Sequence, residues 1–164
     1  MVSIDVLFKE GKISLIRDLE LNRYISFFEN SFKDNLWHSA KNVCEFPRWS
    51  IISGYYAMHD ISKLIIAKRL KIKVDFEVHS TTIKILKEMV NDIEVVNLFE
   101  KGYAEFLSFA NDLDEAKKER TKMQYYTGTG FLKEEYKKKA MEFYTNVVLI
   151  YVEKIKRLYG VEDE

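Results

Sequence analysis

The sequence is poor in the residues that interrupt or cross-link a chain. Of its 164 residues one is proline, Pro47, and six are glycine, so long stretches contain nothing that would break a helix. The single cysteine, Cys44, excludes an intramolecular disulfide, and three scattered histidines with that one cysteine do not suit a structural zinc site. We therefore expect no metal, no cofactor and a reducing, cytoplasmic location.

The sequence also lacks a net charge and a long apolar run. Its 26 basic residues balance its 26 acidic ones, so any contact with nucleic acid would depend on a local patch. The most apolar region, 51–67, is interrupted by His59, Asp60 and Lys63, and the amino terminus lacks the long uncharged core of a signal peptide. We expect a protein that does not cross a membrane.

Apolar residues recur at helical spacing along most of the chain. The spacing predicts helices at about 14–43, 47–70, 78–90, 93–109, 112–124 and 132–159, and it indicates no strand. Pro47 suits the first turn of the second helix, because its missing amide hydrogen costs nothing there. The predicted fold is all-α, an up-and-down bundle of five to six helices forming one domain over 1–164, with its core at about 14–159 and an acidic tail at 160–164.

The second predicted helix carries small residues on one stripe. These residues are Ser50, Ser53, Gly54 and Ala57. Small side chains predict that another backbone approaches this helix closely. His59 lies on the same buried helix, which favours a core or interface histidine over a general base.

The segment 119–126, Glu-Arg-Thr-Lys-Met-Gln-Tyr-Tyr, carries the most informative charge in the sequence. If this stretch is helical, Arg120 lies on the inward-facing stripe of Leu113 and Met123. A guanidinium cannot lose its charge, so Arg120 needs a carboxylate, a phosphate, a backbone acceptor or water in a cleft or an interface. The segment is therefore a candidate binding site.

Three local patterns resemble those of small prokaryotic HEPN-domain proteins. The run Ser-Gly-Tyr-Tyr-Ala-Met-His at 53–59 resembles a motif of their second helix, and His79 resembles the residue that opens their next helix. Arg120 followed by Tyr125 resembles the signature that precedes their last long helix. The resemblance implies a HEPN-like bundle, a homodimer in which two such motifs share one cleft, and a site for RNA or a nucleotide.

The resemblance also assigns roles to particular residues. It makes the following residues candidates for ligand binding: Arg120, Tyr125, Tyr126, His59 and His79. Many small HEPN proteins are similar to toxins of toxin–antitoxin pairs, which implies a nucleotidyltransferase partner and makes Tyr125 and Tyr126 candidate sites of nucleotidyl modification. Arg120 and Tyr125 are the candidate catalytic residues.

One departure from the family bears on catalysis. HEPN ribonucleases have a histidine four to six residues after the arginine, whereas positions 125–127 here are Tyr, Tyr and Thr. Arginine suits the stabilisation of charge on a phosphorane, but tyrosine, with a reference pKa of about 10, is a poor base at neutral pH. The sequence therefore favours binding over efficient cleavage.

Two other interpretations remain open from the sequence. In the first, the protein is an active metal-independent endoribonuclease in which His59 or His79 replaces the missing histidine. In the second, it is a structural dimeric adaptor, in which Arg120 pairs with an acidic neighbour and both tyrosines pack at the dimer interface.

Overall fold

The structure, a computed structural model, describes residues 3–119 and 129–161, and it is mostly helical, as the sequence predicts. The elements follow one another as α1 (Ile4–Lys9), β1 (Ile13–Leu15), α2 (Asp18–Asn42), α3 (Pro47–Leu70), β2 (Ile72–Val74), α4 (Val78–Met89), α5 (Ile93–Glu119), α6 (Thr129–Phe143), the π-helical turn η1 (Tyr144–Val148) and α7 (Leu149–Tyr159). None of the helices in this described part is long and apolar enough to cross a membrane.

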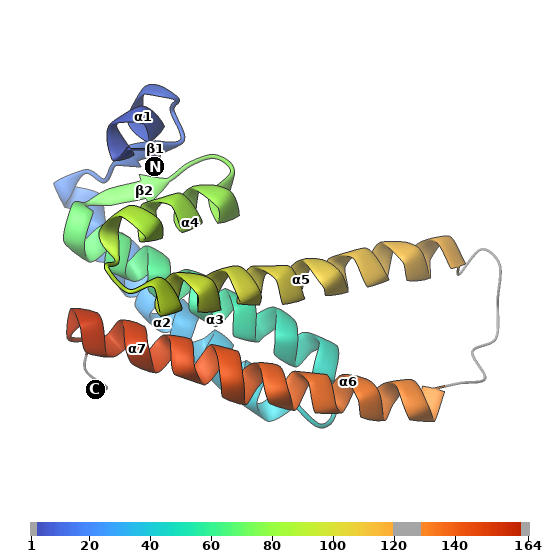
Figure 1. Cartoon of the computed structure of the whole chain (residues 1–164). Coiled ribbons are helices and arrows are strands. Elements are labelled where there is room, and N and C mark those ends of the chain that lie inside the picture. The colour runs from blue at the N-terminus through green and yellow to red at the C-terminus, as the bar shows by residue number, and fades with distance from the viewer. Residues whose placement is uncertain (1–2, 120–128, 162–164) are drawn as a thin grey trace.

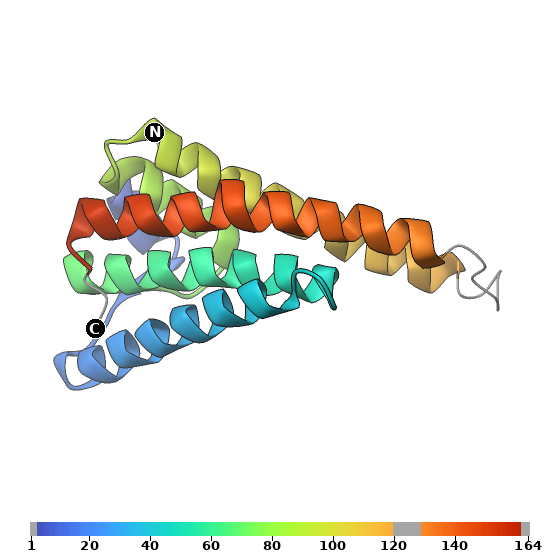
Figure 2. The same cartoon turned by 90° about the horizontal axis from the view of Figure 1, so that it is seen from below.

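Helix α3 is the centre of the bundle. It packs antiparallel to α2 along its length and contacts α5, α6, η1 and α7 on its other sides (Figures 1 and 2). Sixteen of its 24 residues are buried, which explains why the sequence shows apolar residues on more than one face. Pro47 occupies the first turn, as predicted.

The small residues of α3 permit the predicted close approach. A Cβ atom added at Gly54 would lie 2.9 Å from both Ser39 Oγ of α2 and Val148 Cγ2 of η1. Ser39 and Ser50 also exchange hydrogen bonds, because each hydroxyl donates to the other residue's carbonyl at 2.8 Å. The small stripe therefore brings α2 and η1 against the central helix.

The expectation of no strand was wrong. Strands β1 and β2 form a two-stranded antiparallel sheet in which Ile13 pairs with Val74 and Leu15 with Ile72. With α1 and α4 the sheet covers a second apolar cluster at one end of the molecule (Figure 1). Each strand has only three residues, so period-two alternation is too short to be recognised in the sequence.

Several helix boundaries also differ from the prediction. The first long helix begins at Asp18 and not near position 14, since 13–15 belong to β1. Helix α5 is continuous from Ile93 to Glu119, so no separate short helix begins near Asn111. Asn111 and Asp112, residue types that favour helix N-termini, therefore lie inside a helix whose backbone hydrogen bonds continue past them.

The last long helix changes its hydrogen-bonding pattern in the middle but keeps its direction. The π-helical turn η1 joins α6 to α7, and the three run on as one rod in Figure 2. No sequence signal predicted this turn.

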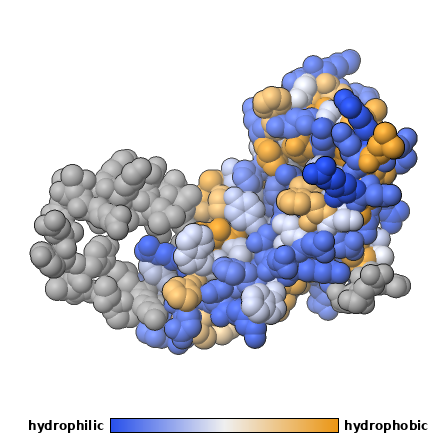
Figure 3. Space-filling model, turned by 180° about the vertical axis from the view of Figure 1, so that it is seen from behind, coloured by the Kyte–Doolittle hydropathy of each residue, from blue (hydrophilic) through white to orange (hydrophobic). Residues whose placement is uncertain are grey.

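The two ends of the molecule differ in shape. The C-terminal part of α5 and the N-terminal part of α6 extend beyond the α2–α3 hairpin, whereas the sheet, α1 and α4 gather at the opposite end (Figures 1 and 2). Seen from behind, the surface is largely hydrophilic with small apolar groups between the polar ones (Figure 3).

Candidate functional site

The structure brings together two of the predicted site residues. The ring centroids of His59 and His79 lie 5.1 Å apart, although the two residues come from different helices. Arg120, Tyr125 and Tyr126 lie outside the described residues. Among the described residues, the candidate site therefore centres on His59 and His79.

Local structure explains why the two histidines meet. His59 lies one helical turn after Tyr55 on α3, so their rings share one face of the helix. His79 is the second residue of α4, which begins after β2 returns the chain to the side of α3. Helix α5 approaches α3 closely at Gly102, where an added Cβ would lie 2.9 Å from Met58 Cε. This approach places the aromatic residues of α5 against the histidines.

We call the resulting group of rings the histidine patch. It consists of Tyr55, Tyr56 and His59 of α3, His79 of α4, and Tyr103 and Phe106 of α5. His79 stacks on Tyr103 at 5.0 Å between centroids, and Tyr55 stacks on Phe106 at 4.8 Å. Tyr55 and His59 are buried, Tyr56 is 38% exposed, and the other three rings are half-buried.

The key polar contact of the patch joins Tyr55 to His79. The Tyr55 hydroxyl lies 2.5 Å from Nδ1 of His79. Among the described residues His79 is the hydrogen-bond partner of this buried hydroxyl, so the hydroxyl hydrogen is paired only if Tyr55 donates. Burial also raises the pKa of Tyr55 well above its usual range, which keeps the phenol protonated.

This contact fixes the tautomer of His79. A donating Tyr55 occupies the lone pair on Nδ1, so the proton of the neutral imidazole resides on Nε2. Burial, then the neighbouring His59 and Lys63, lower the pKa of His79, which favours the neutral ring. His79 therefore offers an N–H donor, and it has no free lone pair with which to act as a base.

His59 has a different environment. Its side chain is 3% exposed, and Nε2 has no hydrogen-bond partner among the described residues. Nδ1 lies 3.8 Å from Asp60 Oδ1, which is too long for a hydrogen bond. Burial lowers the pKa of His59, the neighbouring Asp60 opposes this effect in part, and Lys63 adds to it. The burial expected of a core histidine is confirmed.

The carboxylate of Asp60 is hydrogen-bonded to helix α2. Its Oδ2 accepts hydrogen bonds from Ser31 Oγ at 2.6 Å and from Asn35 Nδ2 at 3.0 Å, both on α2. This network fixes the carboxylate beside His59 without reaching a hydrogen-bonding distance from it. Asp60 therefore does not work as the orienting carboxylate of a catalytic histidine.

The patch is well separated from the end of α5. Glu119 lies thirteen positions after Phe106, which at a rise of 1.5 Å per helical residue corresponds to about 20 Å. The C-terminal end of α5 is therefore distinct from the patch and does not lie within one helical turn of it.

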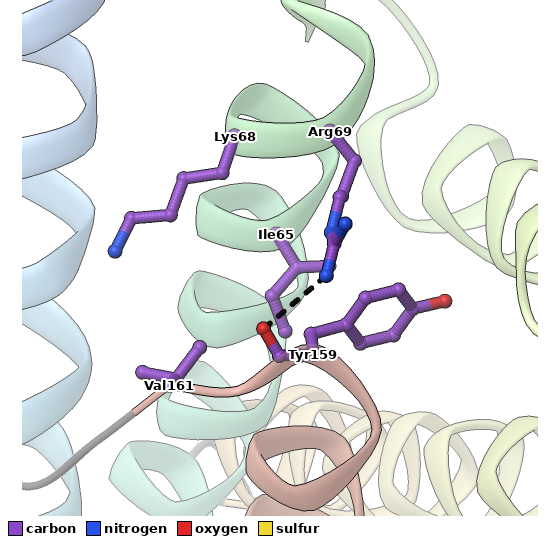
Figure 4. Close-up of a pocket in the computed structure, with 5 residues that line it drawn as sticks. All are labelled: Ile65, Lys68, Arg69, Tyr159 and Val161. Atoms are coloured by element: carbon purple, nitrogen blue, oxygen red, sulfur yellow. Dashed lines mark hydrogen bonds between the residues drawn. The ribbon is translucent and has the colours of Figure 1, made fainter.

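A hollow of about 270 Å³ lies elsewhere, between the C-terminal ends of α3 and α7 (Figure 4). We call it the basic hollow; it is lined by Ile65, Lys68, Arg69, Tyr159 and Val161. Arg69 donates to the Tyr159 carbonyl at 3.4 Å and lies over its ring, while Lys68 lies 3.8 Å from Glu29. Both cations are therefore already paired with protein groups. The helix C-termini beside them carry partial negative charge, which disfavours the binding of an anion in the hollow.

Sequence reasoning missed part of the patch. Tyr103 falls within the predicted helix 93–109, but no local sequence pattern indicates that it packs against His79, 24 positions earlier. Tyr55 belongs to the run 53–59 on which the resemblance rests, but that run does not predict its contact with His79. A signal that could have been used is the spacing of Phe99, Tyr103 and Phe106, an aromatic stripe opposite Tyr55.

Residues 3–119 and 129–161 contain no group of three or more histidine, cysteine, aspartate or glutamate side chains that could hold a metal ion. The patch therefore has to be interpreted through its rings and hydrogen-bonding groups. Comparison of the chain with protein-family models, with curated proteins and with solved structures gives no match.

Proposed function

We propose that this protein is a HEPN-like helical module that binds RNA or a nucleotide without cleaving it efficiently. One observation carries the proposal: the half-buried His79, locked by Tyr55 as an N–H donor, lies among aromatic rings that reach the surface. Donors beside aromatic rings are the elements with which proteins bind unpaired bases. The two histidines that meet here are also those singled out by the resemblance.

The same geometry weighs against catalysis by the patch. A general base needs a free lone pair within reach of the substrate hydroxyl. His79 has its Nδ1 lone pair engaged by Tyr55, and His59 is 97% removed from solvent. Binding is therefore the better account than an endoribonuclease that uses His59 or His79.

The proposal keeps a role for the segment 119–126. Arg120 supplies a permanent positive charge for a phosphate, with Tyr125 and Tyr126 nearby in the sequence. The family resemblance adds a homodimer and a nucleotidyltransferase partner to the proposal.

The test is direct binding of RNA. A labelled single-stranded RNA of mixed sequence is titrated with the protein at low salt, and binding is followed by fluorescence anisotropy. We expect saturable binding that Arg120→Ala weakens, since a lost phosphate contact lowers affinity and its salt dependence. The absence of binding to RNA and to nucleotides would contradict the proposal.

The same samples test cleavage. After prolonged incubation the RNA is analysed on a denaturing gel, and we expect it to remain intact. Cleavage that His79→Gln abolishes would favour the ribonuclease interpretation instead. A protein that binds no RNA but dissociates on Arg120→Ala would favour the structural adaptor.

A further inference from the structure

We propose that the histidine patch is a subsite for an unpaired nucleobase. In this subsite the base stacks against Tyr56, and a carbonyl oxygen of the base accepts a hydrogen bond from His79 Nε2–H. This inference rests on the proposed function and specifies which part of the RNA the patch binds. The phosphate is left to other contacts.

The charge of the patch argues for a base. The charged groups that act on its histidines are Lys63 and Asp60, which have opposite signs, and burial lowers the pKa of Lys63 itself. A strong phosphate contact uses a charged donor such as arginine. A neutral imidazole donor among aromatic rings instead suits an uncharged planar ligand.

The rings provide the surface on which a base can lie. Tyr56 is 38% exposed and contacts the edge of Phe106 at 5.7 Å, and Phe106 contacts His79 at 5.9 Å. Tyr56 and His79 thus border the same half-buried ring. Tyr55 is fully buried beneath them and holds the imidazole in place.

The polarity of the donor adds selectivity. Because Tyr55 occupies Nδ1, His79 can give a hydrogen bond to a ligand but cannot accept one. Uracil and guanine offer exocyclic carbonyl oxygens as acceptors, whereas the acceptors of adenine that flank its amino donor are ring nitrogens. We therefore expect the patch to bind uridine and guanosine more tightly than adenosine.

The experiment compares ligands and matched variants. The full-length protein is titrated with uridine, adenosine, ribose 5-phosphate and single-stranded oligouridylate. The variants are Tyr56→Ala, with Tyr56→Phe as its ring-conserving control, and His79→Phe, with far-UV circular dichroism and thermal melting to verify folding. Tyr159→Ala at the basic hollow is the control for an aromatic residue elsewhere.

We expect uridine to bind more tightly than adenosine, and ribose 5-phosphate not to compete with it. Stacking contributes enough that Tyr56→Ala should weaken oligouridylate binding roughly tenfold, while Tyr56→Phe and Tyr159→Ala leave it unchanged. His79→Phe should remove the preference for uridine. Because Tyr56 lies at the surface, its pair of variants remains informative if His79→Phe does not fold.

Two results would overturn the inference in distinguishable ways. If oligouridylate binds but Tyr56→Ala and the folded His79→Phe bind it as well as the wild type, the patch is not the base subsite, and the proposed function survives. If ribose 5-phosphate displaces uridine from the patch, the ligand is a phosphate. If no RNA or nucleoside binds, both the inference and the proposed function fail.

Discussion

The histidine patch and the basic hollow are both built from aromatic and basic side chains, but they differ in what remains available to a ligand. In the basic hollow, Arg69 is engaged by the Tyr159 carbonyl and ring, and Lys68 by Glu29. In the histidine patch, Tyr55 engages one nitrogen of His79 and thereby leaves a defined donor on the other. Concavity and positive charge are thus poorer guides to a site here than hydrogen-bonding capacity.

The buried parts of the two regions should respond most strongly to truncation. Tyr55→Ala removes a fully buried ring that contacts both histidines and Phe106, and should lower the free energy of unfolding by about 3–5 kcal/mol. Tyr159→Ala removes a half-buried ring at the basic hollow and should cost less. Urea denaturation of both variants measures the difference, and equal losses would contradict the contrast.

Removing only the Tyr55 hydroxyl isolates the polar contact. Tyr55→Phe keeps the ring but leaves Nδ1 of His79 without its donor, and should cost about 1 kcal/mol. A hydrogen bond to the neutral imidazole disfavours protonation, so its loss should raise the pKa of His79 toward the ordinary value. Histidine proton NMR over a pH series checks this. An unchanged pKa would mean that the hydroxyl does not control the ring.

Acid should destabilise the patch and not the hollow. The pKa values of His59 and His79 are lowered in the folded protein, chiefly by burial, so the unfolded chain binds more protons below its ordinary histidine pKa of about 6.5. Stability is therefore complete above that pH and is lost as pH falls through the folded pKa values. Asp60 and Lys63 face the histidines, and both residues are retained in the variants that test this prediction.

The acid effect has a matched control. His59→Phe keeps a ring at the position but removes one titrating group, so its midpoint of denaturation should fall less between neutral and mildly acidic pH than that of the wild type. Lys68→Ala at the basic hollow should follow the wild-type slope. A wild-type protein whose stability does not fall with acid would contradict the lowered pKa values.

The smallest effects should come from the surface cations of the basic hollow. Lys68 and Glu29 form a partly exposed ion pair near the surface, and surface pairs contribute at most about 1 kcal/mol. Lys68→Ala and Arg69→Gln should therefore change stability little and leave RNA binding unchanged in anisotropy titrations. Weaker RNA binding by both variants would place phosphate in the hollow and reverse the comparison.

The sequence predicted the scaffold better than the site. Apolar spacing and Pro47 predicted both ends of α3 correctly, because a buried helix of 24 residues shows helical periodicity over many turns. Strands β1 and β2 have only three residues each, and their pairing joins residues 57 to 61 positions apart, which depends on the tertiary fold. Helix α5 continues past Asn111 because its backbone hydrogen bonds prevail over the preference of such a residue for helix ends.

The site was predicted only in part for a similar reason. His59 and His79 were singled out from separate motifs, but nothing local indicates that their rings lie 5.1 Å apart. The role of Tyr55 as the donor that fixes the tautomer of His79 is a property of three-dimensional contact between α3 and α4. Arg120, Tyr125 and Tyr126 lie outside the described residues, so their roles stay predictions.

The central claim is that His79 presents a donor and not a base, and the protonation of its two ring nitrogens tests it most directly. Nitrogen-15 NMR of histidine-labelled protein at neutral pH distinguishes the tautomers by the shifts of Nδ1 and Nε2. We predict a neutral His79 ring with Nε2 protonated and Nδ1 bare, and the Nδ1 signal should shift in Tyr55→Phe. A ring protonated on Nδ1, or a charged ring at neutral pH, would contradict the account.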